Sequence, residues 1–144
     1  MMDAMELKLC DIQGRLFELF TCCGYDAESL VKEFMTSDLA RDLDSEYNRM
    51  QWAGEEYLLE ELLATCKEKL TAKIKDVSKE ALFWMGYIYR YWHFYTGEES
   101  SKIYKQASFD TMNTNYLMFH TLDAEVAIEN LKEIYRQKVQ GVKQ

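Results

Sequence analysis

Two histidines are the first candidates for catalytic or metal chemistry, because an imidazole can act as acid, base or metal ligand near neutral pH. They are His93, inside a run of aromatic residues, and His120, ahead of the last predicted helix. Helical zinc or di-iron sites need spacings such as HExxH or ExxH, and neither pattern occurs. Glu56 and Glu60 share a helix face but lack such a partner. We therefore expect structural roles for both histidines and no bound metal or other cofactor.

Nucleophilic and phosphate-binding motifs are also missing from the sequence. No GxSxG elbow is present, and no glycines are spaced as GxGxxG or as a P-loop. The four cysteines fit no common zinc spacing; they are Cys10, Cys22, Cys23 and Cys66. Without a basic segment followed by an apolar one at the start of the chain, these thiols indicate a reduced, cytoplasmic compartment. An enzyme built from scattered residues remains an alternative to a binding protein.

The densest feature is the stretch 81–97, ALFWMGYIYRYWHFYTG, in which eight of the thirteen residues from Phe83 to Tyr95 are aromatic. A helix that is apolar nearly all round is normally the central helix of a bundle. Tyrosine and tryptophan are also enriched where proteins bind one another. We therefore expect a mixed role for this helix, with an inner and an outer set of side chains.

The inner set is expected to be Trp84, Ile88 and Tyr91. The outer set, which we predict as interaction residues at the surface, is Tyr89, Arg90 and His93. If the helix borders a ligand pocket instead, that pocket should lie beside Tyr91, His93 or His120.

Helical periodicity accounts for most of the chain, because apolar residues recur at three- and four-residue steps. No proline and only six glycines interrupt it. The expected helices cover about residues 9–23, 27–35, 45–70, 78–97, 101–107, 110–116 and 124–139, with a short turn over 37–43. Ser78 and Gly97 should begin and end the aromatic helix. Thr121 or Asp123 should fix the last turn by accepting hydrogen bonds from free amides of the final helix.

Charge is unevenly distributed along the 144 residues, whose net charge is −8. Residues 1–70 hold 16 Asp and Glu against seven Lys and Arg, and residues 71–144 hold nine against ten. An acidic surface repels phosphate backbones, so nucleic acid is an unfavourable partner and a basic protein a better one. A DNA-binding regulator remains an alternative, if Lys102 and Lys105 share a basic face. No apolar run approaches the length of a membrane span.

The segment TGEESSKIYKQASFDTMNTNYLMFHTLDAEVAIENLKEIY resembles a family of small bacterial helical domains encoded beside ADP-ribosyltransferase-like toxins. The matching positions, within about the last 60 residues, are Gly97, Tyr104, Tyr116, Phe119, His120 and Thr121. The resemblance implies an antitoxin-like or accessory component of a toxin–antitoxin-like operon. It supplies no catalytic residue. The acidic first half has no counterpart in the compact members of that family.

Taken together, the residues predict one all-α domain over 1–144, a bundle of about six helices around a central aromatic helix. An acidic half of about 1–75 precedes the aromatic and C-terminal half of about 76–144. The leading hypothesis is a non-enzymatic protein-interaction module whose partner is a basic, toxin-like protein. A DNA-binding regulator and an enzyme or small-ligand protein are the alternatives. The sequence does not determine the oligomeric state.

Overall fold

The aromatic run folds into helix α5 (Lys79–Thr96) in the computed structural model, which describes residues 2–45 and 53–143. At its start the Ser78 hydroxyl accepts a hydrogen bond of 3.1 Å from the Ala81 amide. At its end Gly97 has φ 80°, and its amide donates to the His93 carbonyl at 2.7 Å. Only glycine adopts this left-handed conformation without strain. Both predicted ends of the aromatic helix are confirmed.

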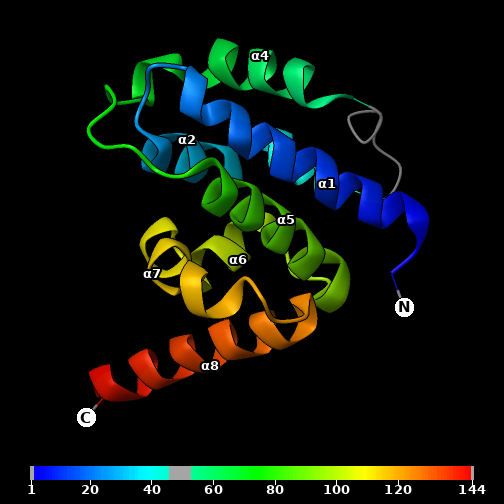
Figure 1. Ribbon diagram of the computed structural model, residues 1–144, viewed down its shortest axis with the longest axis vertical. Coiled ribbons are helices and arrows are strands. Elements are labelled where there is room, and N and C mark those ends of the chain that lie inside the picture. The colour runs from blue at the N-terminus through cyan, green and yellow to red at the C-terminus, as the bar shows by residue number, and fades with distance from the viewer. Residues whose placement is uncertain (1, 46–52, 144) are drawn as a thin grey trace.

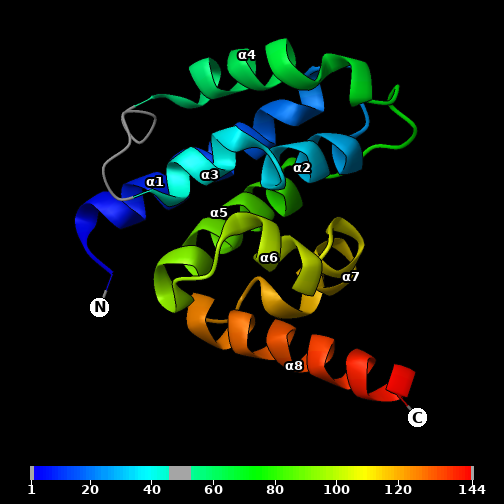
Figure 2. The same cartoon turned by 180° about the vertical axis from the view of Figure 1, so that it is seen from behind.

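The other regular elements of the described chain are also helices, and none is a strand. They are α1 (Ala4–Leu19), α2 (Ala27–Met35), α3 (Asp38–Asp44), α4 (Glu55–Cys66), α6 (Ser100–Gln106), α7 (Phe109–Phe119) and α8 (Ala124–Lys143). From top to bottom, Figure 1 shows α4, α1, α5 and α8, with α6 and α7 between α5 and α8. Figure 2 shows α2 and α3 on the other side of α1. The predicted all-α class is confirmed, and the helices form one compact body.

Helix α5 occupies the predicted central position, because it contacts α1, α6, α7 and α8. Its contact with α1 is the most extensive between any two elements of the described chain. Two glycines make this close approach possible. A Cβ at Gly86 would lie 2.5 Å from the carbonyl oxygen of Gln13, and one at Gly14 would lie 2.8 Å from the Phe83 ring. The absence of a side chain at these positions lets the two helices pack directly against each other.

The bundle has more helices than the six or so predicted, and one of them replaces a turn. Residues 38–44 form α3, whose first amides are capped by the Ser37 hydroxyl at 3.2 Å from the Ala40 nitrogen. The long helix expected over 45–70 is shorter, because α4 begins only after Gly54. The part of that prediction over residues 46–52 lies outside the described residues.

Backbone hydrogen bonds join the turn after α1 to the segment after α4. The segment after α4 runs beside the turn between α1 and α2, where Tyr25 and Ala72 form an isolated antiparallel bridge. The Asp26 amide donates to the Thr71 carbonyl at 2.8 Å, and the Lys73 amide donates to the Gly24 carbonyl at 3.2 Å. These bonds fix the connection that leads into α5.

Candidate functional site

An aromatic groove opens between α5, α7 and the start of α8. Its cavity has a volume of about 320 Å³. Five lining side chains carry rings, one carries a carboxylate, and three are aliphatic. In chain order they are Glu80, Phe83, Trp84, Tyr87, Ile88, Tyr116, His120, Leu122 and Ala124. We refer to this cavity and its lining residues as the aromatic groove.

One wall of the groove is a ladder of rings along α5. Phe83, Tyr87 and Tyr91 are four residues apart, a spacing that places them one above another on a helix. The rings of Phe83 and Tyr87 stack with centroids 6.1 Å apart and planes at 27°. Tyr87 and Tyr91 repeat this arrangement at 6.2 Å and 28°. The ring faces are therefore turned toward each other along the helix, and Phe83 and Tyr87 also line the cavity.

The opposite wall combines rings from α5 and α7. Trp84 meets Tyr116 edge to face with centroids 5.7 Å apart, and Tyr116 stacks on His120 at 4.6 Å. His120 Nδ1 lies 2.9 Å from the Tyr116 carbonyl oxygen and 3.1 Å from that of Leu117. Carbonyl oxygens only accept hydrogen bonds, so this geometry assigns a proton to Nδ1. His120 is thus held against the end of its own helix.

Negative charge accompanies the ladder. Glu80 lines the groove, and the first turns of α8 place carboxylates beside the next two tyrosines. The Tyr91 hydroxyl donates to Glu125 and the Tyr95 hydroxyl donates to Glu129, both at 3.3 Å. Burial, followed by the charge of Glu125, raises the pKa of Tyr91. This hydroxyl therefore stays a hydrogen-bond donor at neutral pH.

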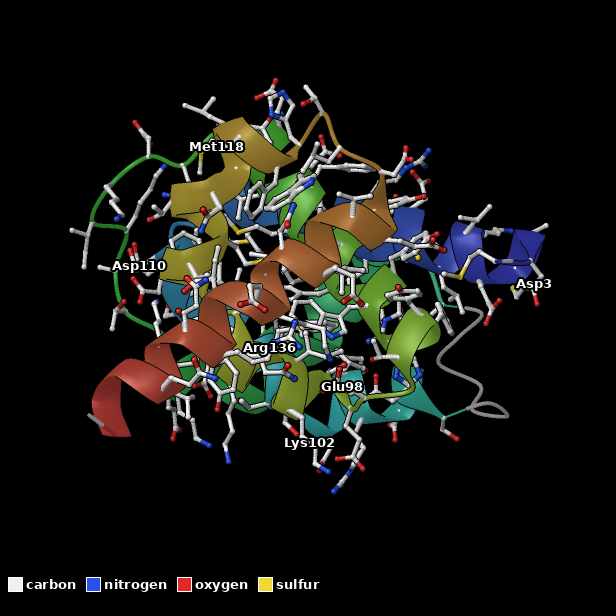
Figure 3. The ribbon with its side chains drawn as sticks, turned by 90° about the horizontal axis from the view of Figure 1, so that it is seen from below. Asp3, Glu98, Lys102, Asp110, Met118 and Arg136 are labelled. Carbon is white, nitrogen blue, oxygen red and sulfur yellow. The ribbon has the colours of Figure 1, made fainter. Side chains whose placement is uncertain are left out.

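Three exposed apolar side chains lie at the end of α7 and in the turn that follows it. Leu117 and Met118 follow Tyr116 directly and are 79% and 64% exposed. Leu122, which lines the groove, is also exposed. Figure 3 shows Met118 at the edge of the molecule, on the side opposite to Glu98 and Lys102. We call Leu117, Met118 and Leu122 the apolar rim.

Two predicted surface residues of α5 are instead buried, which corrects the expected outer set. Tyr89 and Arg90 are each only 1% exposed. The Tyr89 hydroxyl donates to the Ala107 carbonyl at 2.6 Å, and burial raises its pKa well above the ordinary value. His93 is partly buried, with Nδ1 2.7 Å from the Glu98 carbonyl oxygen. Tyr89 and Arg90 are buried because neighbouring helices cover the face of α5 that was predicted to be exposed to solvent.

Arg90 is the centre of a buried polar network. Its Nε donates to Gln13 Oε1 at 2.8 Å, and its Nη1 donates to Asp44 Oδ1 at 2.6 Å. Its Nη2 reaches the Ser100 hydroxyl at 3.2 Å, while the Ser100 amide donates to Asp44 Oδ2 at 2.9 Å. Asp44 therefore both neutralises Arg90 and caps the start of α6. No sequence pattern predicts this network, because its members come from four separated segments.

The predicted pocket residues separate in the structure. His120 lines the aromatic groove, whereas Tyr91 belongs to the ladder one turn beyond the lining residues. Of the inner set, Trp84 and Ile88 are buried as expected, but Tyr91 is only partly buried. The side chain of Tyr91 packs against the edge of the core, and its hydroxyl reaches Glu125 of α8.

The turn before α8 is held by backbone bonds. The Leu122 amide donates to the Phe119 carbonyl at 3.0 Å, and the Asp123 carbonyl accepts from the Ala127 amide at 2.9 Å. Asp123 thus occupies the predicted position at the start of α8. In the described residues, however, no amide of α8 donates to the side chain of Thr121 or Asp123, and both are exposed. The predicted side-chain cap is wrong.

A second cavity, of about 390 Å³, lies between α6, α7 and α8. Lys105 and Lys138 line it, and the Lys138 ammonium lies 3.5 Å from the Thr111 hydroxyl. Lys102 is exposed on the same helix as Lys105 but does not line this cavity. Figure 3 shows Lys102 on the side of the molecule opposite to Met118, together with the acidic Glu98.

Other chemistry is limited in the described part of the chain. Burial raises the pKa of the Cys10 thiol from 9.0 to about 12, which suppresses the nucleophilic thiolate. Residues 2–45 and 53–143 contain no group of three or more His, Cys, Asp or Glu side chains that could hold a metal ion. No helix within these ranges has the length and apolarity needed to cross a membrane.

No protein-family model, curated protein or solved structure matches this chain. The resemblance of the C-terminal residues to toxin-associated helical domains therefore stays a prediction. Its residues have clear places in the fold. Gly97 ends α5, Tyr104 lies on α6, and Tyr116 and His120 stack beside the aromatic groove.

Proposed function

We propose that this protein is a non-enzymatic protein-interaction module that binds its partner through the aromatic groove and the apolar rim. The observation that carries the proposal is a cavity lined by five rings, together with the exposure of Leu117 and Met118 on α7, the helix that contributes Tyr116 to the cavity. Large apolar side chains that gather at the surface beside a groove are typical of binding sites. Aromatic rings add large contact area at low cost in side-chain entropy.

The lining of the groove favours binding over catalysis. Among its lining residues there is no serine, cysteine or lysine to act as a nucleophile. His120 is the one lining side chain suited to proton transfer near neutral pH, and its Nδ1 is engaged by two backbone carbonyls. Glu80 lies in the first turn of α5, where its charge complements the helix dipole.

The resemblance extends this proposal to an antitoxin-like or accessory role, with a basic, toxin-like protein as partner. The acidic residues of the first half support such a partner through charge complementarity. Tyr89→Ala does not test this idea, because Tyr89 is a core residue whose loss would act on folding. The test must change exposed residues.

Co-expression with the products of adjacent genes, followed by affinity purification, tests the proposal. We expect a stable complex that is lost when Leu117→Glu and Met118→Glu are combined. The matched control is Tyr57→Glu, which changes an exposed residue of α4, a helix separated from α7 by α1 and α5 (Figure 1), and should leave the complex intact. Circular dichroism of both variants establishes that they are folded. A complex that survives the Leu117 and Met118 changes would remove the groove and its rim from the binding surface.

A small-ligand protein is the second candidate, and the cavity beside His120 favours it. The volume of about 320 Å³ lies at the lower end of the range of small-molecule pockets. Native mass spectrometry of the protein purified from its own host would show a bound small molecule of constant mass. Such a mass, retained without any protein partner, would support this candidate over the first.

A further inference from the structure

We infer that the aromatic groove recognises an arginine side chain on a basic segment of the partner protein. This inference rests on the proposed interaction function and specifies the chemistry of the contact. Two observations carry it: the flat ring faces that line the cavity, and the carboxylates placed along it.

The rings supply the first half of the recognition. A cation placed over an aromatic face is attracted by the negative charge of that face, and arginine is the cation that most often does so. Phe83 and Tyr87 lie nearly parallel, with planes at 27°, and Tyr116 and His120 do the same. The rings of each pair face each other, so a guanidinium would stack on the outer face of a pair, where its planar shape matches the ring better than a compact ammonium does.

The carboxylates supply the second half. Glu80 lines the groove itself and can accept two parallel hydrogen bonds from a guanidinium. Glu125 and Glu129 continue the negative charge along the ladder through Tyr91 and Tyr95. The nearest basic residue in sequence, Lys79, lines a different cavity together with Arg15 and Glu18.

The side chains that line the aromatic groove include one carboxylate, that of Glu80, and no basic group. Lys102 lies on the side of the molecule opposite to Met118, together with Glu98 (Figure 3), and Lys105 and Lys138 line the cavity between α6, α7 and α8. The charge that lines the groove therefore favours a basic segment over an acidic one.

Nuclear magnetic resonance titration at about pH 8, where an imidazole is ordinarily neutral, tests the inference. The probes are N-acetyl-arginine amide, its uncharged isostere N-acetyl-citrulline amide, and choline. We expect saturable shifts of the Trp84 indole and His120 ring signals with the arginine probe, and much weaker shifts with the citrulline probe. Glu80→Gln and Tyr87→Leu should each weaken arginine binding about two- to fivefold. Tyr57→Leu changes an exposed tyrosine on α4 and should have no effect.

Three outcomes would overturn the inference. Equal shifts with arginine and citrulline would show that the groove reads shape or apolarity rather than charge. Saturable binding of choline without arginine binding would assign the groove to small quaternary ammonium ligands. An absence of saturable shifts with any probe would remove cation recognition. The co-expression experiment is independent of these outcomes, because a complex lost on changing Leu117 and Met118 supports the interaction function even when arginine does not bind.

Discussion

The guanidinium of Arg90 is buried with each of its nitrogen donors bonded to a different side chain. Gln13, Asp44 and Ser100 accept these bonds at 2.6 to 3.2 Å. In the described residues no buried side-chain polar atom lacks a partner. Burial lowers the pKa of Arg90, and the neighbouring Asp44 opposes that change.

Removing the carboxylate should therefore cost far more than removing an exposed one. We expect Asp44→Ala to lower the free energy of unfolding by about 3–5 kcal/mol, because it leaves a charge buried without a partner. Adding Arg90→Met to Asp44→Ala should recover part of this loss. Asp42→Ala on the same helix should cost less than about 0.5 kcal/mol. Urea denaturation measures all four proteins, and a cost for Asp44→Ala close to that of Asp42→Ala would contradict a paired role.

Glu98 provides a pH-dependent contribution to stability. Burial raises its pKa, but hydrogen bonds from Lys132 at 2.9 Å, the Trp92 indole at 2.9 Å and Gln106 at 2.6 Å outweigh burial. The resulting pKa falls from 4.5 to about 2. Because the pKa of Glu98 is lower in the folded state than in the unfolded state, its ionised carboxylate stabilises the folded protein at pH values above about 4.5. This stability is lost as the pH falls from about 4.5 towards 2.

Glu98→Gln should consequently destabilise the protein at about pH 7 by roughly 1–2 kcal/mol, allowing for its partial exposure. Its difference from the wild type should shrink as the pH falls below 4.5. Glu60→Gln, on the exposed side of α4, should change stability by less than about 0.5 kcal/mol. Denaturant unfolding at a series of pH values measures these differences. A constant difference across the acidic range would show that the charge of Glu98 is unimportant.

Part of the candidate site could be predicted residue by residue. His120 is one of the three residues, with Tyr91 and His93, beside which a possible pocket is predicted, and it lines the groove. The partners of Arg90 could not be predicted, because Gln13 and Asp44 are 77 and 46 positions away. When its partners are unknown, a charged residue such as Arg90 is expected at the surface. Tyr89 was wrongly predicted to be exposed together with Arg90.

At the scale of elements, the crossing of α1 and α5 depends on two glycines that differ in what they face. Gly86 faces the backbone of Gln13, which can move only if the whole helix moves. Gly14 faces the ring of Phe83, a side chain that can rotate. Close helix packing of this kind is sensitive to a single added methyl group.

Gly86→Ala should lower the free energy of unfolding by about 1–3 kcal/mol, despite the better helix propensity of alanine. Gly14→Ala should cost less, because the Phe83 ring can shift. Gly141→Ala is the matched control: it lies in α8 with no atom near its added Cβ, and should stabilise by about 0.5–1 kcal/mol. Thermal unfolding of the three variants gives this order, and a neutral Gly86→Ala would contradict the close crossing.

Periodicity predicted most elements, since Ser78, Gly97 and the three- to four-residue spacing of apolar groups act locally. It missed α3, a seven-residue helix whose buried side chains are few. It also could not say which sides of α5 are covered. A helix that is apolar nearly all round has no polar face that would indicate which side is exposed to solvent.

The whole molecule is tied together by residues from both halves of the sequence. Gln13 and Asp44 belong to the acidic half, whereas Arg90 and Ser100 belong to the aromatic and C-terminal half. Gly86 and Tyr89 of the second half also pack on α1, where Phe17 lies 6.1 Å from the Tyr89 ring. One half alone would expose these surfaces.

A fragment of residues 76–144 should therefore fail to fold cooperatively, although it contains the region that resembles compact domains. We expect little cooperative thermal unfolding by circular dichroism, in contrast to a single transition for the full chain. Adding a separately produced fragment of residues 1–75 should restore the transition. A steep, reversible transition of the 76–144 fragment alone would show that the second half is an independent domain.

The position of the Arg90 network along the chain has a consequence for folding rates. Its bonds to Gln13 and Asp44 form only after segments 77 and 46 residues apart have come together. Closing such long loops costs entropy before any bond is gained, so these contacts are expected to form after the folding barrier has been crossed. Asp44→Ala should then accelerate unfolding in stopped-flow measurements and leave the folding rate nearly unchanged. The network would therefore set the lifetime of the folded state and not the rate at which that state forms.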